Sequence, residues 1–285
     1  MSQSTFGKKF TVTTWGESHG KALGTVVDGV PAGLFLTEAD IQTYLDRRKP
    51  GQSRYTTARN EGDEVEILSG IFEGQTTGTP ISMIVRNKDQ RSRDYGNIAQ
   101  TYRPGHADFG FDSKYGFRDY RGGGRSSGRE TIGRVAAGAI AARILKELGI
   151  TLQAYTSSIG PVSCQSYHPE IIPENSFYMP DMVAAEKAAK YLEKCMKEED
   201  SAGGVVECRI SGVPAGIGDP VFGKLDAAFA QALMSIGAVK AVEIGDGVKV
   251  STMKGSENND GFHMENGRIV KTTNHSGGIL GGISD

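Results

Sequence analysis

Cysteine is scarce in this chain: its 285 residues include three, Cys164, Cys195 and Cys208, and no two of them form a CxxC pair. An odd number without that pairing fits a reducing cytoplasm, and we expect each cysteine to be a small buried apolar residue. The first residues, MSQSTFGKKF, lack the pattern of a secretory leader, and no apolar run is long enough to span a membrane. The sequence therefore predicts a cytoplasmic protein with no membrane partner.

Neither sign of charge is in excess, because 34 Asp and Glu residues stand against 32 Lys and Arg residues. No global field thus favours nucleic acid or an anionic membrane. Arginine is nevertheless unevenly placed, with thirteen of the sixteen between Arg47 and Arg134. Since a guanidinium binds carboxylate and phosphate through paired hydrogen bonds, we expect this segment to bind anions, with a solvated basic face as the alternative.

Strands dominate the first ninety residues of the sequence. The expected strands are rich in Val, Ile and Thr and are bounded by Gly, Pro or Asn: FTVTT, LGTVVDGV, DEVEILSGIF and ISMIVRN. One helix interrupts them, with a capping-box pattern at Thr37 and Asp40 and a stop at Lys49-Pro50-Gly51. Further helices are expected over residues 131–148, 181–198 and 220–236. The alanine-rich helix 131–148 carries little charge, so we expect it to be packed on more than one side.

The pentapeptide GVPAG occurs twice, at residues 29–33 and 212–216, each time after an expected strand and before an expected helix. This repeat suggests two related strand-turn-helix halves in a duplicated α+β architecture, although five residues can also recur by chance. No low-complexity linker separates the halves, so residues 1–285 are expected to form one compact domain.

The stretch RGGGRSSGRET, residues 121–131, combines backbone donors freed by glycine with arginine and serine side chains. Gly123 and Gly128 have the spacing of a nucleotide-binding P-loop, but Arg129 and Glu130 replace its lysine and hydroxyl residue, which disfavours nucleotide hydrolysis. The remaining prediction is an oxyanion site made by Ser126, Ser127 and backbone N–H groups at the start of a helix. A flexible glycine turn with a helix cap is the alternative.

Two histidines occupy positions suited to proton transfer. His19 follows an apolar strand in WGESHGK, and His106 lies on a turn in TYRPGHADF with Arg103 and Asp108 close in sequence. A purely structural role is the alternative for each. Neither has metal-ligand spacing to another His, Cys or carboxylate, so no metal site is predicted.

A third basic stretch, DRRKPGQSRYTTAR, follows a helix end and enters a loop, where its arginines could converge on a small polyanion: Arg47, Arg48, Arg54 and Arg59. RNA binding would use similar residues, but more aromatic residues between them and a net positive domain would be expected. We therefore predict no nucleic-acid partner.

Five stretches taken together resemble the chorismate synthase family, in the same order and over essentially the whole chain: GESHGK (16–21), RRKPGQSR (47–54), RPGHADF (103–109), RGGGRSSGRET (121–131) and NHSGGILGGIS (274–284). The resemblance implies an α+β fold in which helices are sandwiched between antiparallel sheets with internal pseudo-duplication, assembled as a homotetramer. It also implies a carbon–oxygen lyase of the shikimate pathway, which leads to the aromatic amino acids. Its reaction is the 1,4-anti elimination of phosphate from 5-enolpyruvylshikimate 3-phosphate to give chorismate.

The family requires reduced FMN although the reaction has no net redox change. A reduced flavin against the substrate ring can donate electron density as phosphate leaves and recover it afterwards. NADPH is a candidate reductant for the flavin, but the sequence contains no visible dinucleotide fingerprint.

Carried over by motif, the resemblance assigns roles to residues of this chain. His19 would protonate the departing phosphate, and His106 would supply or hold a proton near the flavin. Four arginines would grip the phosphate and carboxylates of the substrate: Arg48, Arg54, Arg103 and Arg129. The FMN-contacting positions would be Arg125, Ser126, Ser127, Gly237, Ala238 and Gly281.

Family members continue beyond GGIS into a segment that this chain, ending at Ser284-Asp285, apparently lacks. That segment includes a Lys-Pro-Thr stretch that contacts FMN and an Arg-His-Asp motif. If the chain is complete, we expect exposed apolar surface. The alternative function is then a C-terminally truncated, non-catalytic homologue that binds flavin or anion.

Overall fold

The computed structural model describes residues 3–56, 61–88 and 97–285. They form two compact units, the first ending at Ser211 and the second running from Gly212 to Asp285, and each is described by itself. The expectation of one domain over residues 1–285 stays a prediction.

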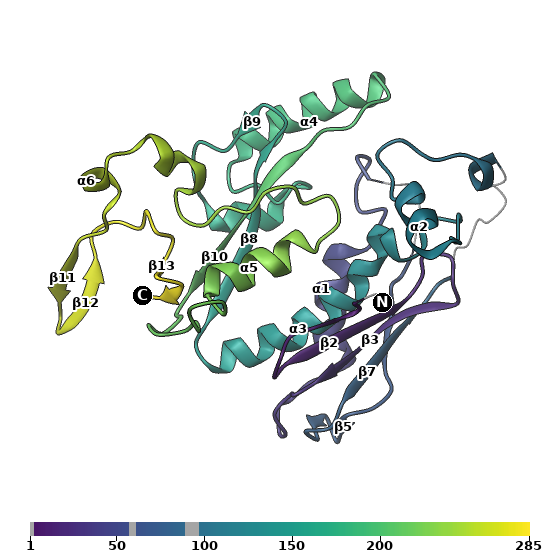
Figure 1. Cartoon of the computed structure of the whole chain (residues 1–285), viewed down its shortest axis with the longest axis horizontal. Helices are drawn as coiled ribbons and strands as arrows, with labels where there is room; N and C mark the ends of the chain where they lie inside the picture. The colour runs from purple at the N-terminus through teal and green to yellow at the C-terminus, as the bar shows by residue number, and fades with distance from the viewer. Residues whose placement is uncertain (1–2, 57–60, 89–96) are drawn as a thin grey trace. The chain divides into compact units, whose positions relative to one another are not determined.

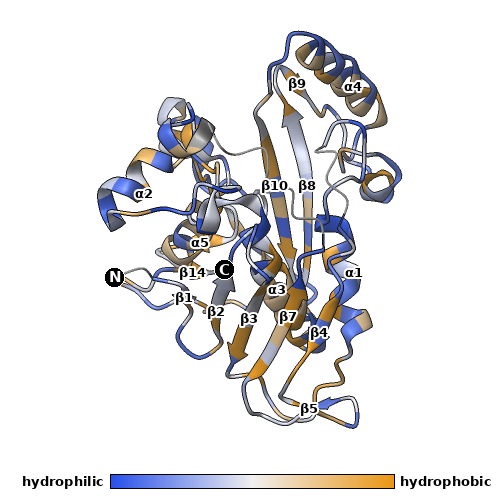
Figure 2. Ribbon diagram, turned by 90° about the vertical axis from the view of Figure 1, so that its right-hand side faces the viewer, coloured by the Kyte–Doolittle hydropathy of each residue, from blue (hydrophilic) through white to orange (hydrophobic). Residues whose placement is uncertain are grey.

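The first unit is built on a five-stranded antiparallel sheet (Figure 1). Its strands, in spatial order, are β1 (Thr5–Phe6), β2 (Thr11–Gly16), β3 (Ala22–Asp28), β7 (Ile81–Arg86) and β4 (Val65–Ile67). Strand β7 buries every second residue, Ile81, Met83 and Val85, as a strand with one face on the core should. The hydropathy colours of Figure 2 show β3 and β7 as largely apolar strands.

The predicted strands are confirmed with one difference. DEVEILSGIF does not form a single strand, because Gly70 adopts a left-handed φ of +84° and turns the chain. The residues after it form β5 (Ile71–Phe72), which pairs with β6 (Gln75–Thr76) instead of continuing β4.

Helix α1 (Glu38–Arg48) begins as predicted with a capping box. The Thr37 hydroxyl accepts the Asp40 N–H at 3.4 Å, and the Asp40 carboxylate accepts the Thr37 N–H at 2.8 Å. The helix ends at Lys49, before Pro50, and buries Ile41 and Leu45.

Helix α3 (Thr131–Glu147) contacts helix α1, strands β2 and β3 of the five-stranded sheet, and strand β8 of a second sheet. It is therefore packed on more than one side, as predicted. Its apolar and small residues make this close packing possible. At Gly133 a Cβ atom would lie 2.8 Å from Thr14 Cγ2 on β2. Glycine at this position lets the helix approach the sheet.

The second sheet has the order β10 (Gly204–Ser211), β8 (Thr151–Ile159) and β9 (Val162–Ser163), all antiparallel. Helix α4 (Met182–Lys197) contacts β9, begins at the Asp181 N-cap and is partly solvated, as predicted. The cysteine prediction is wrong for Cys208, which is exposed on the outer strand β10, while Cys195 is buried on α4 and Cys164 is half-buried.

The shorter elements of the first unit are α2 (Asp108–Tyr115) and the 3-10 helices η2 (Asn97–Gln100), η3 (Gly124–Ser126), η4 (Gly128–Glu130) and η5 (Pro169–Glu174). Among the helices of the described residues, none is long and apolar enough to cross a membrane.

The second unit consists of short elements: α5 (Leu225–Met234), η6 (Gly247–Thr252), α6 (Gly255–Asn258), and the strand pairs β11 (Phe262–Glu265) with β12 (Arg268–Lys271) and β13 (Ile279–Leu280) with β14 (Ile283–Ser284). Helix α5 is shorter than the predicted 220–236, because Asp219 and Gly223 form an antiparallel bridge before it. It buries none of its residues.

Both glycines of the repeated GVPAG have a left-handed φ in each copy. Gly29 and Gly33 have φ of +82° and +84°, and Gly212 and Gly216 have φ of +82° and +100°. The first copy lies between β3 and α1 and the second between β10 and α5, so the predicted strand-turn-helix order is confirmed at both.

Candidate active site

The glycine-rich loop of residues 121–131 leads directly into α3, as predicted. Its three consecutive glycines, Gly122, Gly123 and Gly124, have φ of +63°, +89° and +54°. Residues with a side chain rarely adopt this left-handed region of φ, so glycine is required for the backbone path. The path places the loop against two other segments of the first unit.

Both predicted histidines lie against this loop. A Cβ built on Gly122 would overlap the imidazole of His19, and a Cβ built on Gly123 would lie 2.8 Å from His106 Nε2. The absence of side chains at these two positions therefore makes room for both rings. The hydrogen bond from Arg121 lowers the pKa of the Asp119 carboxyl, and His19 lies close enough to contribute to the same shift.

Asn87, at the end of β7, joins the His19 segment to the loop. Its Nδ2 donates to the carbonyls of Glu17 at 3.1 Å and Gly20 at 2.8 Å, on either side of His19. Its Oδ1 accepts a hydrogen bond from Arg129 Nη2 at 2.8 Å. One amide thus holds the histidine segment and the arginine of the loop together.

Arg129 and Arg48 share a buried carboxylate. Asp63 Oδ1 lies 3.0 Å from Arg129 Nη2, and Asp63 Oδ2 lies 3.0 Å from Arg48 Nη2, while the Asp63 side chain is wholly buried. Two guanidinium groups thus share one buried carboxylate. Arg129 Nε and Nη1 are buried and have no hydrogen-bond partner among the described residues, so the cluster retains donors for an anion.

Asp108, the first residue of α2, gathers the charged groups around His106. It accepts hydrogen bonds from the Arg103 backbone N–H at 3.2 Å and from Arg103 Nε and Nη2 at 2.8 Å each. His106 Nδ1 lies 3.0 Å from Asp108 Oδ1, and Arg118 Nε lies 3.6 Å from the same carboxylate oxygen. The bonds from Arg103 hold the pKa of Asp108 well below its ordinary value, although burial opposes them.

Arg125, Ser126 and Ser127 hold the loop itself. Arg125 donates to the carbonyls of Gly16 and Thr14 at 3.0 and 3.2 Å, and Ser126 Oγ donates to the Gly123 carbonyl at 2.7 Å. Ser127 Oγ accepts the Arg129 N–H at 3.4 Å and caps η4.

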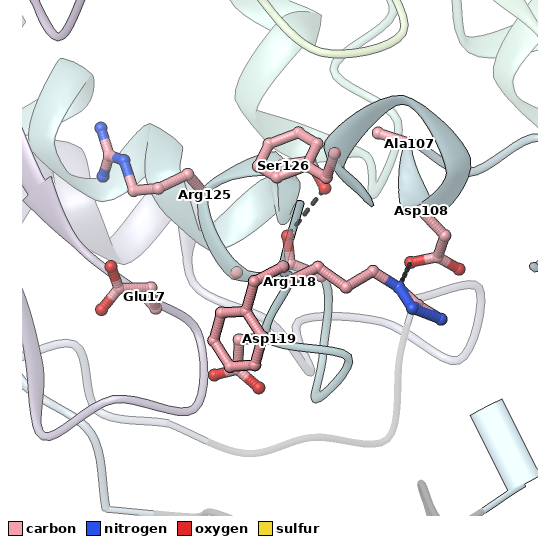
Figure 3. A pocket seen from close by; sticks show the side chains of 11 residues that line it. Glu17, Ala107, Asp108, Arg118, Asp119, Arg125 and Ser126 are labelled. Atoms are coloured by element: carbon pink, nitrogen blue, oxygen red, sulfur yellow. Dashed lines mark hydrogen bonds and ion pairs between the residues drawn. The ribbon is translucent and has the colours of Figure 1, made fainter. Parts of the chain in front are cut away.

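A cavity of about 140 Å³ lies beside this loop. As Figure 3 shows, Arg125 and Ser126 line it together with Glu17 and the Asp108–Arg118 pair. Phe111 and Phe117 also belong to its walls. The cavity thus adjoins two of the residues that the motifs assign to FMN and the carboxylate that contacts His106.

Comparisons with known proteins show the family of the chain. A family model described as "Chorismate synthase" matches residues 10–285. The chain is 63% identical over its full length to a chorismate synthase from Agathobacter rectalis, and 55% identical to one from Methanosarcina mazei, of which it covers 78% and 79%. A crystal structure of chorismate synthase superimposes with a TM-score of 0.83 at 32% identity, covering 98% of this chain and 82% of the other.

The chain belongs to the chorismate synthase family. The resemblance of its five motifs is confirmed, and so is the fold class, an α+β arrangement of helices between antiparallel sheets.

The predicted site residues fall into separate groups. The first unit brings His19, His106 and Arg129 together around the glycine-rich loop. Arg54 instead pairs with Glu193 of α4, and its Nη2 also donates to the Tyr55 hydroxyl at 2.7 Å. Arg59 lies outside the described residues.

The remaining FMN positions of the family, Gly237, Ala238 and Gly281, belong to the second unit, where Ala238 and Gly281 have φ of +69° and +61°. Their part in one flavin site stays a prediction. Within the described residues, no group of His, Cys, Asp and Glu gathers where it could hold a metal ion.

Sequence reasoning missed Asp63 and Asn87. Asp63 looked like the start of a strand and Asn87 like the end of one, and their partners lie far along the chain. A signal for Asp63 was available only in hindsight: a buried arginine pair needs a carboxylate between its members.

Proposed function

We propose that the site around residues 121–131 carries out the chorismate synthase reaction, in which 5-enolpyruvylshikimate 3-phosphate loses phosphate by a 1,4-anti elimination. The observation that carries this proposal is the contact of His19 and His106 with neighbouring glycines of a loop that also holds Arg129. Two proton-carrying side chains and a buried cationic cluster are the groups that such an elimination needs.

The arginines would bind the anionic groups of the substrate. Arg48 and Arg129 are held by Asp63, and the two unpaired donors of Arg129 favour it as a ligand for phosphate or carboxylate. Burial supports this role, because a guanidinium attracts an anion more strongly where water is excluded. Arg103 and Arg54 would add to this grip, Arg54 after exchanging Glu193 for the substrate.

The histidines would handle protons. His19, held through its segment by Asn87, would donate a proton to the oxygen of the departing phosphate. His106, beside the cavity and against Gly123, would hold a proton toward the bound flavin. General acid–base groups of this kind contribute about 10²- to 10⁴-fold to the rate.

Reduced FMN would be held beside the loop. Arg125, Ser126 and Ser127, with the cavity walls of Phe111 and Phe117, would line the part of the flavin site that belongs to the first unit. When bound, the reduced flavin supplies electron density to the substrate as phosphate leaves. We also propose that the chain forms a homotetramer, which light scattering would test.

The test compares the wild-type chain with His19→Gln and His106→Gln under anaerobic conditions with chemically reduced FMN. We expect kcat to fall about 100-fold or more in each variant, because each loses a proton-transfer group, while substrate affinity changes less than about threefold. Thermal denaturation checks that both variants fold. Full activity in either variant would remove that histidine from the mechanism.

A further inference from the structure

We propose that Thr14 is a positioning residue for His19: its hydroxyl holds the Arg125 guanidinium on the end of β2 and so keeps the glycine-rich loop against the histidine. The inference rests on the proposed function only for its effect on turnover. The contact itself can be measured without turnover, as the rate at which backbone N–H groups of the loop exchange with solvent.

The Arg125 guanidinium makes three hydrogen bonds to the end of β2. Nη1 donates to the Gly16 carbonyl at 3.0 Å, and Nη2 donates to the Thr14 carbonyl at 3.2 Å and to Thr14 Oγ1 at 2.6 Å. The bond to Oγ1 is the shortest of the three, and a charged donor makes each of them stronger than a neutral bond. The Thr14 side chain is therefore a principal attachment of Arg125 to the strand.

The Thr14 hydroxyl can accept from Arg125 because its own proton is directed elsewhere. A guanidinium only donates, so Oγ1 must accept from Nη2, and it donates in turn to Glu130 Oε1 at 3.1 Å. Glu130 is held by Arg134, whose Nε donates to Oε2 at 2.9 Å. Donor and acceptor are thus matched at each step from Arg125 through Thr14 to Glu130.

Arg125 connects the two segments that meet at His19. Its partner Gly16 lies three residues before His19. On the loop, Arg125 lies three residues after Gly122, the glycine whose Cβ would overlap the His19 imidazole. The hydrogen bonds of one guanidinium therefore hold both sides of the contact between the ring and the loop.

Two substitutions of Thr14 separate the hydrogen bonds from the packing. Thr14→Val keeps nearly the same shape but removes the hydroxyl, so Arg125 loses its shortest bond to β2 and Glu130 loses a donor. Thr14→Ser keeps the hydroxyl and removes Cγ2, the atom that faces Gly133 on α3. A role in positioning predicts that serine preserves the loop and valine does not.

The experiment measures hydrogen–deuterium exchange of the full chain by mass spectrometry. The amides to follow are those of Ser126 and Ser127, which donate to carbonyls of the loop at 2.9 and 3.4 Å. We expect both to exchange about 10- to 100-fold faster in Thr14→Val, because a hydrogen bond to a charged group no longer holds the loop. In Thr14→Ser their exchange should stay within about threefold of the wild type, because Oγ still accepts from Arg125.

Turnover gives a second readout. In the anaerobic assay, kcat of Thr14→Val should fall about tenfold or more because His19 is displaced, while KM changes less than about threefold. Thr14→Ser should keep the kcat of the wild type. A loss of packing alone would instead affect the serine variant, which lacks the methyl group, and spare the valine variant.

Thr25→Val is the matched control. Thr25 lies opposite Thr14 on β3, and its buried hydroxyl donates to the Thr13 carbonyl at 3.2 Å. The substitution removes a threonine hydroxyl from the same sheet without removing a bond of Arg125. It should therefore leave the exchange of the loop and kcat unchanged.

Unchanged exchange of Ser126 and Ser127 in Thr14→Val would overturn the proposal, and so would equally fast exchange in Thr14→Ser or Thr25→Val. If Thr14→Val does not fold, Arg125→Gln removes the guanidinium from the other end of the same contact. Its loop should exchange faster, and an unchanged rate would overturn the proposal as well. A wild-type chain that forms no chorismate would contradict the proposed function, while the exchange rates still decide whether Thr14 holds the loop.

Discussion

Asp63 offers the sharpest test of how the arginine cluster is held. Its carboxylate lies 3.0 Å from both Arg48 and Arg129, whose side chains are 13% and 6% exposed, and it is itself fully buried. Removing the charge of one partner of a buried pair costs about 3–5 kcal/mol, because the other charge is left uncompensated. The two pairs share one carboxylate, so their losses do not simply add. We expect Asp63→Asn to lower the free energy of unfolding by about 3–5 kcal/mol.

Asparagine is the right replacement because position 63 has a φ of +47°, and Asn tolerates this left-handed conformation as Asp does. The control is Asp46→Asn, which neutralises an exposed pair with Lys49 at 3.1 Å and should cost less than about 1 kcal/mol. Urea unfolding followed by circular dichroism and by Trp15 fluorescence gives both values. A loss in Asp63→Asn no larger than that of the control would refute the account of the cluster.

A second measurement on Asp63→Asn tests whether the two arginines bind an anion. Without the Asp63 charge, Arg48 and Arg129 should bind inorganic phosphate more tightly, and a ligand that binds only the folded state raises stability with its concentration. Added phosphate should therefore stabilise Asp63→Asn more than it stabilises the wild type. Equal stabilisation of the two proteins would argue against an anion site at this pair.

Three further predictions concern single positions. Gly133→Ala should lower the unfolding free energy by about 1–3 kcal/mol because its Cβ would meet β2, whereas Gly138→Ala on the open face of α3 should not destabilise; denaturation curves distinguish them. Gly123→Ala should lower kcat about tenfold or more by displacing the neighbouring imidazole, with Gly128→Ala, whose Cβ meets nothing within 4 Å, as the active control in the turnover assay. Backbone N–H bonds lower the pKa of Asp181, so its stabilising effect is present above about pH 4 and is lost in acid; the stability difference between wild type and Asp181→Ala should shrink as pH falls below that value.

Local signals in the sequence predicted the elements that depend on neighbouring residues. The start of α1 follows from Thr37 and Asp40, which lie within one turn of each other and bond as a capping box. Helix α3 follows from its apolar spacing and from the glycines before it. Its packing on two sides was predictable because its surface has too little charge to face water.

The site was predictable in part. The motifs identified His19, His106 and the loop, but nothing local shows that each ring meets one particular glycine of residues 121–131. Such contacts depend on where separate strands and turns meet in space. Arg54 makes the same point, because its partner Glu193 lies on a helix far along the chain.

The ratio of phosphate released to chorismate formed by the 285-residue chain, measured under anaerobic conditions with a catalytic amount of reduced FMN, tests the proposed elimination. We expect one phosphate for each chorismate, with no reduced flavin consumed and no product when the flavin is oxidised. Phosphate released without chorismate would show hydrolysis instead of elimination, and a folded, substrate-binding chain that yields neither product would contradict the proposed function.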